Sequence, residues 1–143
     1  MAEYGRILGV DVGSKRVGLA RTDLLRTIAN PIGTFSPDDS ILEIEKQVNH
    51  EGPVSGIVVG WPLTPEGVPT HATTLAREYM NRLRNKFKGI KIYTMDERYT
   101  SREAVDIMVE SGVPKMKRRK KGRIDQAAAA IILQHFLEAR PEL

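Results

Sequence analysis

The first third of the chain contains short apolar blocks separated by polar turns. Residues 7–10 and 17–20 are rich in β-branched and aliphatic side chains, and Gly13-Ser14-Lys15 between them has the composition of a tight turn. This pattern predicts a β-hairpin. Residues 30–35 continue it as a third strand, and Pro31 places that strand near a sheet edge, where a missing N–H is tolerated.

After residue 35 the apolar spacing changes to three and four residues, which is typical of a helix. Ser36 is expected to be the N-cap, with Pro37 in the first position and Asp39 completing a capping box. The helix should end near residues 50–52. Its expected buried stripe consists of Ile41, Leu42, Ile44 and Val48.

Strands and helices then alternate. Residues 55–60 form a continuous apolar run, as expected for a strand covered on both faces, and a Pro- and Gly-rich loop follows over 61–69. Apolar residues at helical spacing predict a long helix over 70–87, and residues 91–96 predict a fifth strand.

The last part of the chain predicts two helices. Thr100 and Glu103 form a capping box that opens a short helix ending at Gly112 and Pro114, and a final helix spans about 124–139. The order β-β-β-α-β-α-β-α-α predicts an α/β fold with parallel strands in its second half. We expect one domain over residues 1–143, since no repeat or linker interrupts the pattern.

Composition narrows the chemistry. The 143 residues include no cysteine, which excludes disulfides, thiolate zinc sites and cysteine nucleophiles, and the three histidines are too scattered for a zinc motif. Metal chemistry would therefore rest on carboxylates, which favour Mg²⁺ or Mn²⁺. Without a signal-peptide pattern or an apolar run of about 20 residues, the chain is expected to be soluble and cytoplasmic, with no membrane partner.

The net charge of +4 is unevenly distributed. Seven cations fall within nine residues: Lys115, Lys117, Arg118, Arg119, Lys120, Lys121 and Arg123. Without these seven, 15 basic and 18 acidic residues remain, a net charge of −3. This basic run is expected to fill the connection before the last helix and to grip nucleic acid through phosphate contacts. A solvated charged loop is the alternative.

Three acidic residues are expected near the carboxyl ends of the strands, where the active sites and binding sites of α/β proteins usually lie. Asp11 closes the first strand, Glu97 follows the fifth, and Asp125 lies in the first turn of the last helix. Ala128 and Ala129 would let that helix approach the sheet closely. Three converging carboxylates would hold one or two hard cations, which activate water without a histidine or serine.

Each acid also has a plainer interpretation. Asp11 would simply start a turn, Glu97 would form a surface ion pair with Arg98, and Asp125 would cap its helix. The occurrence of all three at strand ends beside the basic run favours the metal site.

Four segments together resemble the YqgF/RuvX family of ribonuclease H-like proteins. They are 9–20 (GVDVGSKRVGLA), 59–63 (VGWPL) with Gly67, 96–101 (DERYTS) and 121–129 (KGRIDQAAA). The resemblance implies a ribonuclease H-like fold, with a five-stranded mixed sheet of order 3-2-1-4-5 flanked by helices. By matching positions it implies that Asp11, Glu97 and Asp125 are the catalytic, metal-binding triad. Trp61 and Tyr99 depart from the expected residue types, which puts substrate fit in doubt.

Other residues near the acids are expected to support the site or the core. Lys15, Arg16 and Arg98 are expected to contact phosphates, although Arg98 is equally suited to a structural role. Trp61 would stack on an unpaired base or, as we favour, close the hydrophobic core. Asp96 is left out of the site because adjacent strand residues face opposite sides.

The resemblance implies a metal-dependent nuclease that processes the 5′ end of the 16S ribosomal RNA precursor, with ribosomal particles as further partners. The alternative is a Holliday junction resolvase acting on branched DNA, which normally requires a two-fold dimer. The sequence shows no obvious dimer surface, so we expect a monomer or weak dimer and favour RNA. An actin-like ATPase domain and a non-catalytic nucleic-acid-binding module are remoter alternatives.

Overall fold

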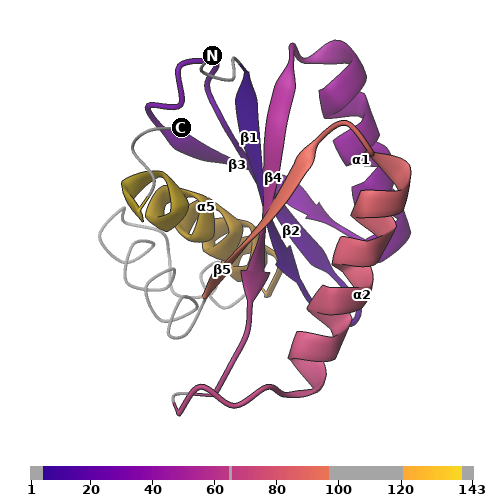
Figure 1. Cartoon of the computed structure of the whole chain (residues 1–143), viewed down its shortest axis with the longest axis vertical. Helices are drawn as coiled ribbons and strands as arrows, with labels where there is room; N and C mark the ends of the chain where they lie inside the picture. The colour runs from indigo at the N-terminus through magenta and orange to yellow at the C-terminus, as the bar shows by residue number, and fades with distance from the viewer. Residues whose placement is uncertain (1–4, 65, 97–120, 140–143) are drawn as a thin grey trace.

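Five strands form one sheet with helices on both of its faces (Figure 1). The computed structural model describes residues 5–64, 66–96 and 121–139, with side chains from residue 126 in the last segment. The strands are β1 (Arg6–Val12), β2 (Val17–Thr22), β3 (Ala29–Phe35), β4 (Val54–Trp61) and β5 (Lys91–Asp96). The helices are α1 (Pro37–His50), α2 (His71–Lys86) and α5 (Lys121–Ala139).

The strand order is β3-β2-β1-β4-β5, which confirms the expected sheet. β1 pairs with β2, and β2 with β3, in antiparallel fashion, while β1, β4 and β5 run parallel. The three parallel strands therefore all end at one border of the sheet, which we call the carboxyl edge. β3, which carries Pro31, is an outermost strand, as its proline predicted.

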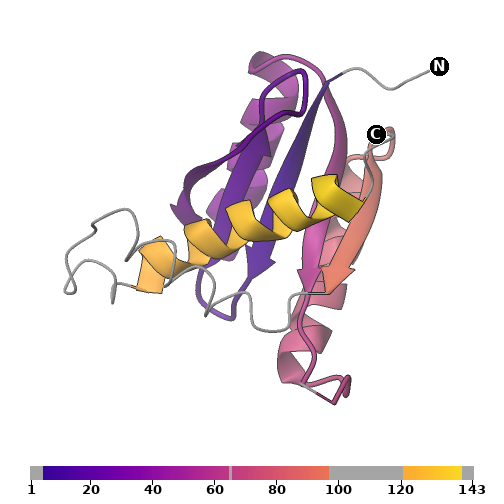
Figure 2. The same ribbon diagram turned by 90° about the vertical axis from the view of Figure 1, so that its left-hand side faces the viewer.

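Two hydrophobic cores lie on opposite faces of the sheet. One lies beneath α1 and α2, and the other lies beneath α5, which crosses the opposite face (Figures 1 and 2). Strand alternation divides β1 between them, because Leu8 and Val10 pack into the first core and Ile7 into the second.

α5 lies very close to β1. A Cβ placed on Gly9 would meet the carbonyl oxygen of Ala129 at 2.8 Å, so only glycine allows this approach. Ala128 and Ala129 are fully buried, which confirms that the small residues let α5 come down onto the sheet. Further along α5, the ring centroid of Phe136 lies 4.9 Å from that of Tyr93 on β5.

Most predicted helix bounds are confirmed within one residue. The Ser36 hydroxyl accepts a hydrogen bond from the Asp39 N–H (3.2 Å), which confirms the N-cap of α1. The final helix, however, begins at Lys121 and not at residue 124, so Lys121 and Arg123 belong to α5 and not to the preceding connection. The helix predicted between Thr100 and Gly112 lies outside the described residues.

The buried stripe of α1 was predicted wrongly at one position. Leu42 is 59% exposed, whereas Gln47 is buried at 4%. The helical period explains the difference, because residues 41, 44 and 47 recur every third position along one face, and residue 42 points away from it. The Gln47 amide is satisfied by Arg21, which donates to it (2.8 Å), and by Glu43, which accepts from it (2.7 Å).

Within the described residues, no helix has the length and apolar character needed to cross a membrane.

Candidate functional site

Asp11 lies inside β1, one residue before the end of the strand. It pairs with Gly18 of β2, and the following pair, Val12 and Val17, closes the hairpin. The Gly13 N–H donates to the Arg16 carbonyl (2.8 Å) and forms the turn beyond this pair. The interpretation of Asp11 as a mere turn residue is therefore wrong, because the residue belongs to the ladder of a central strand.

The side of the sheet that Asp11 occupies follows from strand alternation. Leu8, Val10 and Val12 belong to the core beneath α1 and α2, so Ile7, Gly9 and Asp11 face α5. Asp11 is half-buried and makes contacts of its own in this position. It thus places a carboxylate at the carboxyl edge, on the face covered by α5.

Residue 125 lies on the backbone of the helix that covers this face. Asp125 is the fifth residue of α5 and stands one helical turn before Ala129, whose carbonyl faces Gly9. The N-cap interpretation of Asp125 is wrong, because a cap precedes the helix and residue 125 lies within it. In Figure 2 the first turns of α5 lie on the side of the sheet where β1 ends.

Glu97 and Arg98 lie outside the described residues, directly after β5. Asp96, the last residue of β5, pairs with Trp61 of β4 and is exposed. Tyr93 and Met95 pack against the core beneath α5, so alternation turns Asp96 to the other face. Asp96 and Asp11 therefore belong to opposite faces of the sheet, as expected from the sequence.

The structure places only some of the predicted cations. Lys15 and Arg16 are exposed in the turn after β1, next to Asp11 along the hairpin at the carboxyl edge. Lys121 and Arg123 are placed by their backbone alone. The remaining members of the basic run, Lys115, Lys117, Arg118, Arg119 and Lys120, lie outside the described residues.

The position of Asp11 suits a hard cation. A half-buried carboxylate at the end of a central strand supplies an oxygen ligand of the kind that Mg²⁺ and Mn²⁺ prefer. Among the described side chains no three His, Cys, Asp or Glu residues come together, and those side chains do not include the other two predicted ligands. His71 is exposed at the start of α2, in keeping with a surface role.

Trp61 ends β4 at the same edge. Its ring packs against the core beneath α1 and α2, in agreement with the favoured interpretation that it closes this core. The guanidinium carbon of Arg77, on α2, lies 5.7 Å from the centroid of the ring. Sequence reasoning missed Arg77, because no local pattern links it to a tryptophan 16 positions earlier.

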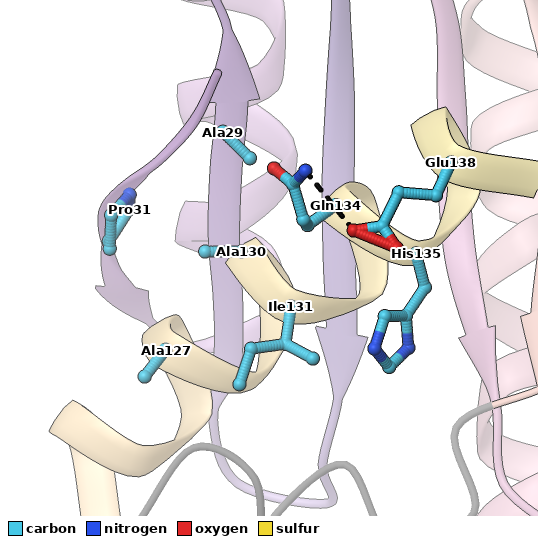
Figure 3. Close-up of a pocket in the computed structure, with 8 residues that line it drawn as sticks. All are labelled: Ala29, Pro31, Ala127, Ala130, Ile131, Gln134, His135 and Glu138. Carbon is cyan, nitrogen blue, oxygen red and sulfur yellow. Dashed lines mark hydrogen bonds between the residues drawn. The ribbon is translucent and has the colours of Figure 1, made fainter. Parts of the chain in front are cut away.

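A hollow of about 440 Å³ lies elsewhere on the α5 face, between α5 and β3 (Figure 3). Small apolar side chains such as Ala29, Pro31 and Ala130 line it, and Gln134 donates to Glu138 (3.4 Å) at its rim. His135 also borders this hollow, which agrees with a packing role. Of the predicted metal ligands only the Asp11 side chain is described, and it does not line this hollow.

Comparisons with known proteins agree with this architecture. The model of the RuvX family, described as Holliday junction resolvase, matches residues 5–139. A Salinibacter ruber protein named "Putative pre-16S rRNA nuclease" is 44% identical over 137 residues, covering 96% of this chain and 95% of the relative. A Chlorobium phaeobacteroides protein of the same name is 41% identical over 133 residues, covering 93% and 92%.

Solved structures agree in fold. The Fowlpox virus resolvase, in complex with Holliday junction DNA, matches with a TM-score of 0.56 at 12% identity, covering 94% of this chain and 97% of that one. Thermus thermophilus RuvC, in complex with a Holliday junction substrate, matches with a TM-score of 0.50 at 15% identity, covering 96% and 97%. The fold is thus ribonuclease H-like, and the chain belongs to the RuvX family of nucleases.

Proposed function

We propose that this chain is a metal-dependent endonuclease that hydrolyses phosphodiester bonds in structured nucleic acid. The position of Asp11 carries the proposal, because a half-buried carboxylate at the end of the central strand stands where α5 brings residue 125 to the same face. The names of the relatives favour the 16S ribosomal RNA precursor as the substrate, and the family resemblance of the sequence suggests its 5′ end as the part that is processed. Such an enzyme would work in the cytoplasm, on or beside ribosomal particles.

The proposed site consists of Asp11, Glu97 and Asp125 as ligands of Mg²⁺ or Mn²⁺. One or two such ions would polarise the scissile phosphate and help a water molecule to lose its proton. The ribose–phosphate backbone would be held by the exposed cations of the hairpin turn, Lys15 and Arg16. Arg98 and the basic run over 115–123 would extend this phosphate contact beyond the turn.

A Holliday junction resolvase is the second candidate, and the description of the family model favours it. Symmetric cleavage of a four-way junction needs two active sites related by a two-fold axis. The two candidates therefore differ in the oligomeric state they require as well as in their substrate.

The experiment compares both substrates under the same conditions. A transcript of the 16S leader and a four-way DNA junction are each incubated with Mg²⁺ or Mn²⁺ and with wild type, Asp11→Asn or Asp125→Asn. Asp38→Asn is the matched control, because Asp38 is exposed on α1 and forms only a surface ion pair with Arg82 (3.0 Å). We expect the transcript to be cut by wild type and the control but not by the two site variants.

Other results would overturn parts of this proposal. Paired symmetric cuts in the junction, with an intact transcript, would favour the resolvase. Binding of both substrates without cleavage of either would contradict autonomous catalysis and support a binding module. Full activity of Asp11→Asn would contradict the proposed site.

A further inference from the structure

Arg77 is held in a defined place at the carboxyl edge. Its guanidinium carbon lies 5.7 Å from the centroid of the Trp61 ring, within the range of about 6 Å for a cation–π contact. Trp61 is itself anchored, since it belongs to the end of β4 and packs against the core. The cation is therefore restrained even though Arg77 is exposed to solvent.

Arg77 also differs from Arg82 and Lys86 of α2 in its partners. Arg82 pairs with Asp38 (3.0 Å) and Lys86 pairs with Glu45 (3.5 Å), both on α1. Within the described residues, Arg77 has no such acidic partner. A guanidinium stacked on an aromatic ring keeps its in-plane N–H donors available, and these match the oxygens of a phosphate.

The segment before α2 fixes the helix against the end of β4. The hydroxyl of Thr73, buried at 1%, donates to the Pro62 carbonyl and accepts from the Thr70 N–H (2.9 Å). Leu63 and Pro69 pair across the intervening loop. The helical turn that carries Arg77 directly follows Thr73, so Arg77 and Trp61 are held at the same end of the sheet.

The pairing of β1 with β4 relates this position to Asp11. Val10 pairs with Val59, so Trp61 lies two residues beyond this pair and Asp11 one residue beyond it, on strands about 4.8 Å apart. Trp61 faces the core beneath α1 and α2, as Val10 and Val59 do, whereas Asp11 faces α5. Arg77 therefore lies at the carboxyl edge on the opposite face of the sheet from Asp11, and Lys15 and Arg16 lie in the turn at the same edge.

We propose that Arg77, positioned by Trp61, binds a backbone phosphate of the nucleic-acid strand where this strand passes over the carboxyl edge, beyond Asp11 and on the α2 face of the sheet. This inference rests on the proposed nuclease function and adds to it a second phosphate contact. Lys15 and Arg16 hold the strand on the β2 side. These two contacts hold the nucleic-acid backbone across the carboxyl edge, so that it passes Asp11.

The experiment measures binding without cleavage. A fluorescein-labelled transcript of the 16S leader is titrated with each protein in EDTA over a series of salt concentrations, and binding is followed by fluorescence anisotropy. For Arg77→Ala, losing one phosphate contact should lower the slope of log K against log salt by about 0.7 to 0.9. At about 0.1 M salt the affinity should fall roughly fivefold to tenfold.

Two variants separate this role from general effects. Arg84→Ala removes an exposed cation two turns further along α2, for which the described residues offer no ion pair, so its slope should equal that of wild type. Arg77→Lys keeps the charge but loses the planar guanidinium and its several N–H donors, so its slope should stay near wild type while its affinity falls by a smaller factor than for Arg77→Ala. Thermal unfolding of each variant checks that the fold is intact.

An unchanged slope for Arg77→Ala, with or without a change in its unfolding temperature, would show that Arg77 only shields Trp61 and would overturn the inference. An equal loss of slope for Arg84→Ala would also overturn it. The binding assay is independent of catalysis. If wild type binds the transcript but never cuts it, the nuclease proposal fails while the role of Arg77 in binding is still decided.

Discussion

At the scale of the residue, Gly9 is a position where a single methyl group would disturb the packing of α5 on β1. The added Cβ would lie 2.8 Å from the Ala129 carbonyl oxygen and 3.0 Å from the Leu133 Cβ, both on α5. Backbone cannot yield as a flexible side chain can, so α5 must shift away from β1. We expect Gly9→Ala to lower the free energy of unfolding by about 1 to 3 kcal/mol.

Urea denaturation followed by circular dichroism measures this effect. Gly89→Ala is the matched control, because an added Cβ there meets no atom within 4 Å. Its free energy of unfolding should stay within about 0.5 kcal/mol of wild type. A Gly9→Ala variant as stable as this control would show that α5 does not need the close approach. If Gly9→Ala folds but loses nuclease activity, the displacement of α5 also displaces residue 125.

At the scale of the element, α1 and α2 are joined by a buried hydrogen bond between Ser40 and Tyr79 (2.6 Å). Ser40 already donates its proton to the Pro37 carbonyl (2.6 Å), so Tyr79 is the donor to Ser40. Burial raises the pKa of Tyr79 from 10.0 to about 12. The unfolded chain therefore loses this proton at lower pH than the folded one.

This pKa shift predicts a stability that falls as pH rises from about 10 to about 12. At neutral pH, Tyr79→Phe should be about 1 kcal/mol less stable than wild type, because the hydrogen bond is lost. At pH 11 the phenol is ionised in the unfolded chain but still protonated in the folded one, which lowers the free energy of unfolding of wild type by about 1 kcal/mol. The two proteins should then be about equally stable. Urea unfolding at both pH values tests this, and a gap that does not change with pH would contradict the raised pKa.

Sequence patterns predicted the elements best where the pattern is local. The hairpin of β1 and β2, the apolar run of β4 and the stripe of α2 each show their period within a few residues. The start of α5 was placed three residues late because Lys121, Gly122 and Arg123 show no apolar period. Leu42 was predicted to be buried because it is apolar and lies next to Ile41 in the sequence. An apolar residue can still face solvent, as Leu42 does.

The candidate site was predictable only in part. The end of β1 could be located from local sequence, so Asp11 was expected at the edge where the structure places it. The cation–π contact between Arg77 and Trp61 joins α2 to β4 through tertiary packing, which no spacing along the chain reveals. Glu97 lies outside the described residues, and the side chain of Asp125 is not described, so their part in the site stays a prediction.

At the scale of the whole molecule, a metal that binds only the folded chain must stabilise it. At a free concentration of ten times its dissociation constant, an ion adds about 1.4 kcal/mol to the free energy of unfolding. We expect Mn²⁺ to raise the unfolding temperature of wild type and of Asp38→Asn, which keeps the proposed ligands. Asp11→Asn should lose most of this increase in a thermal scan. An equal increase in Asp11→Asn would mean that the ion binds elsewhere.

The oligomeric state decides between the two substrates, because one active site makes one cut. A single chain has one copy of Asp11, whereas paired cuts in a four-way junction need two copies related by a two-fold axis. We expect multi-angle light scattering to show a monomer at the concentrations at which the transcript is cut. On the junction, such a monomer should give nicks on one strand at a time and not coordinated pairs. A stable dimer that cuts both strands of the junction in a coordinated way would reverse our preference for RNA and favour branched DNA as the substrate.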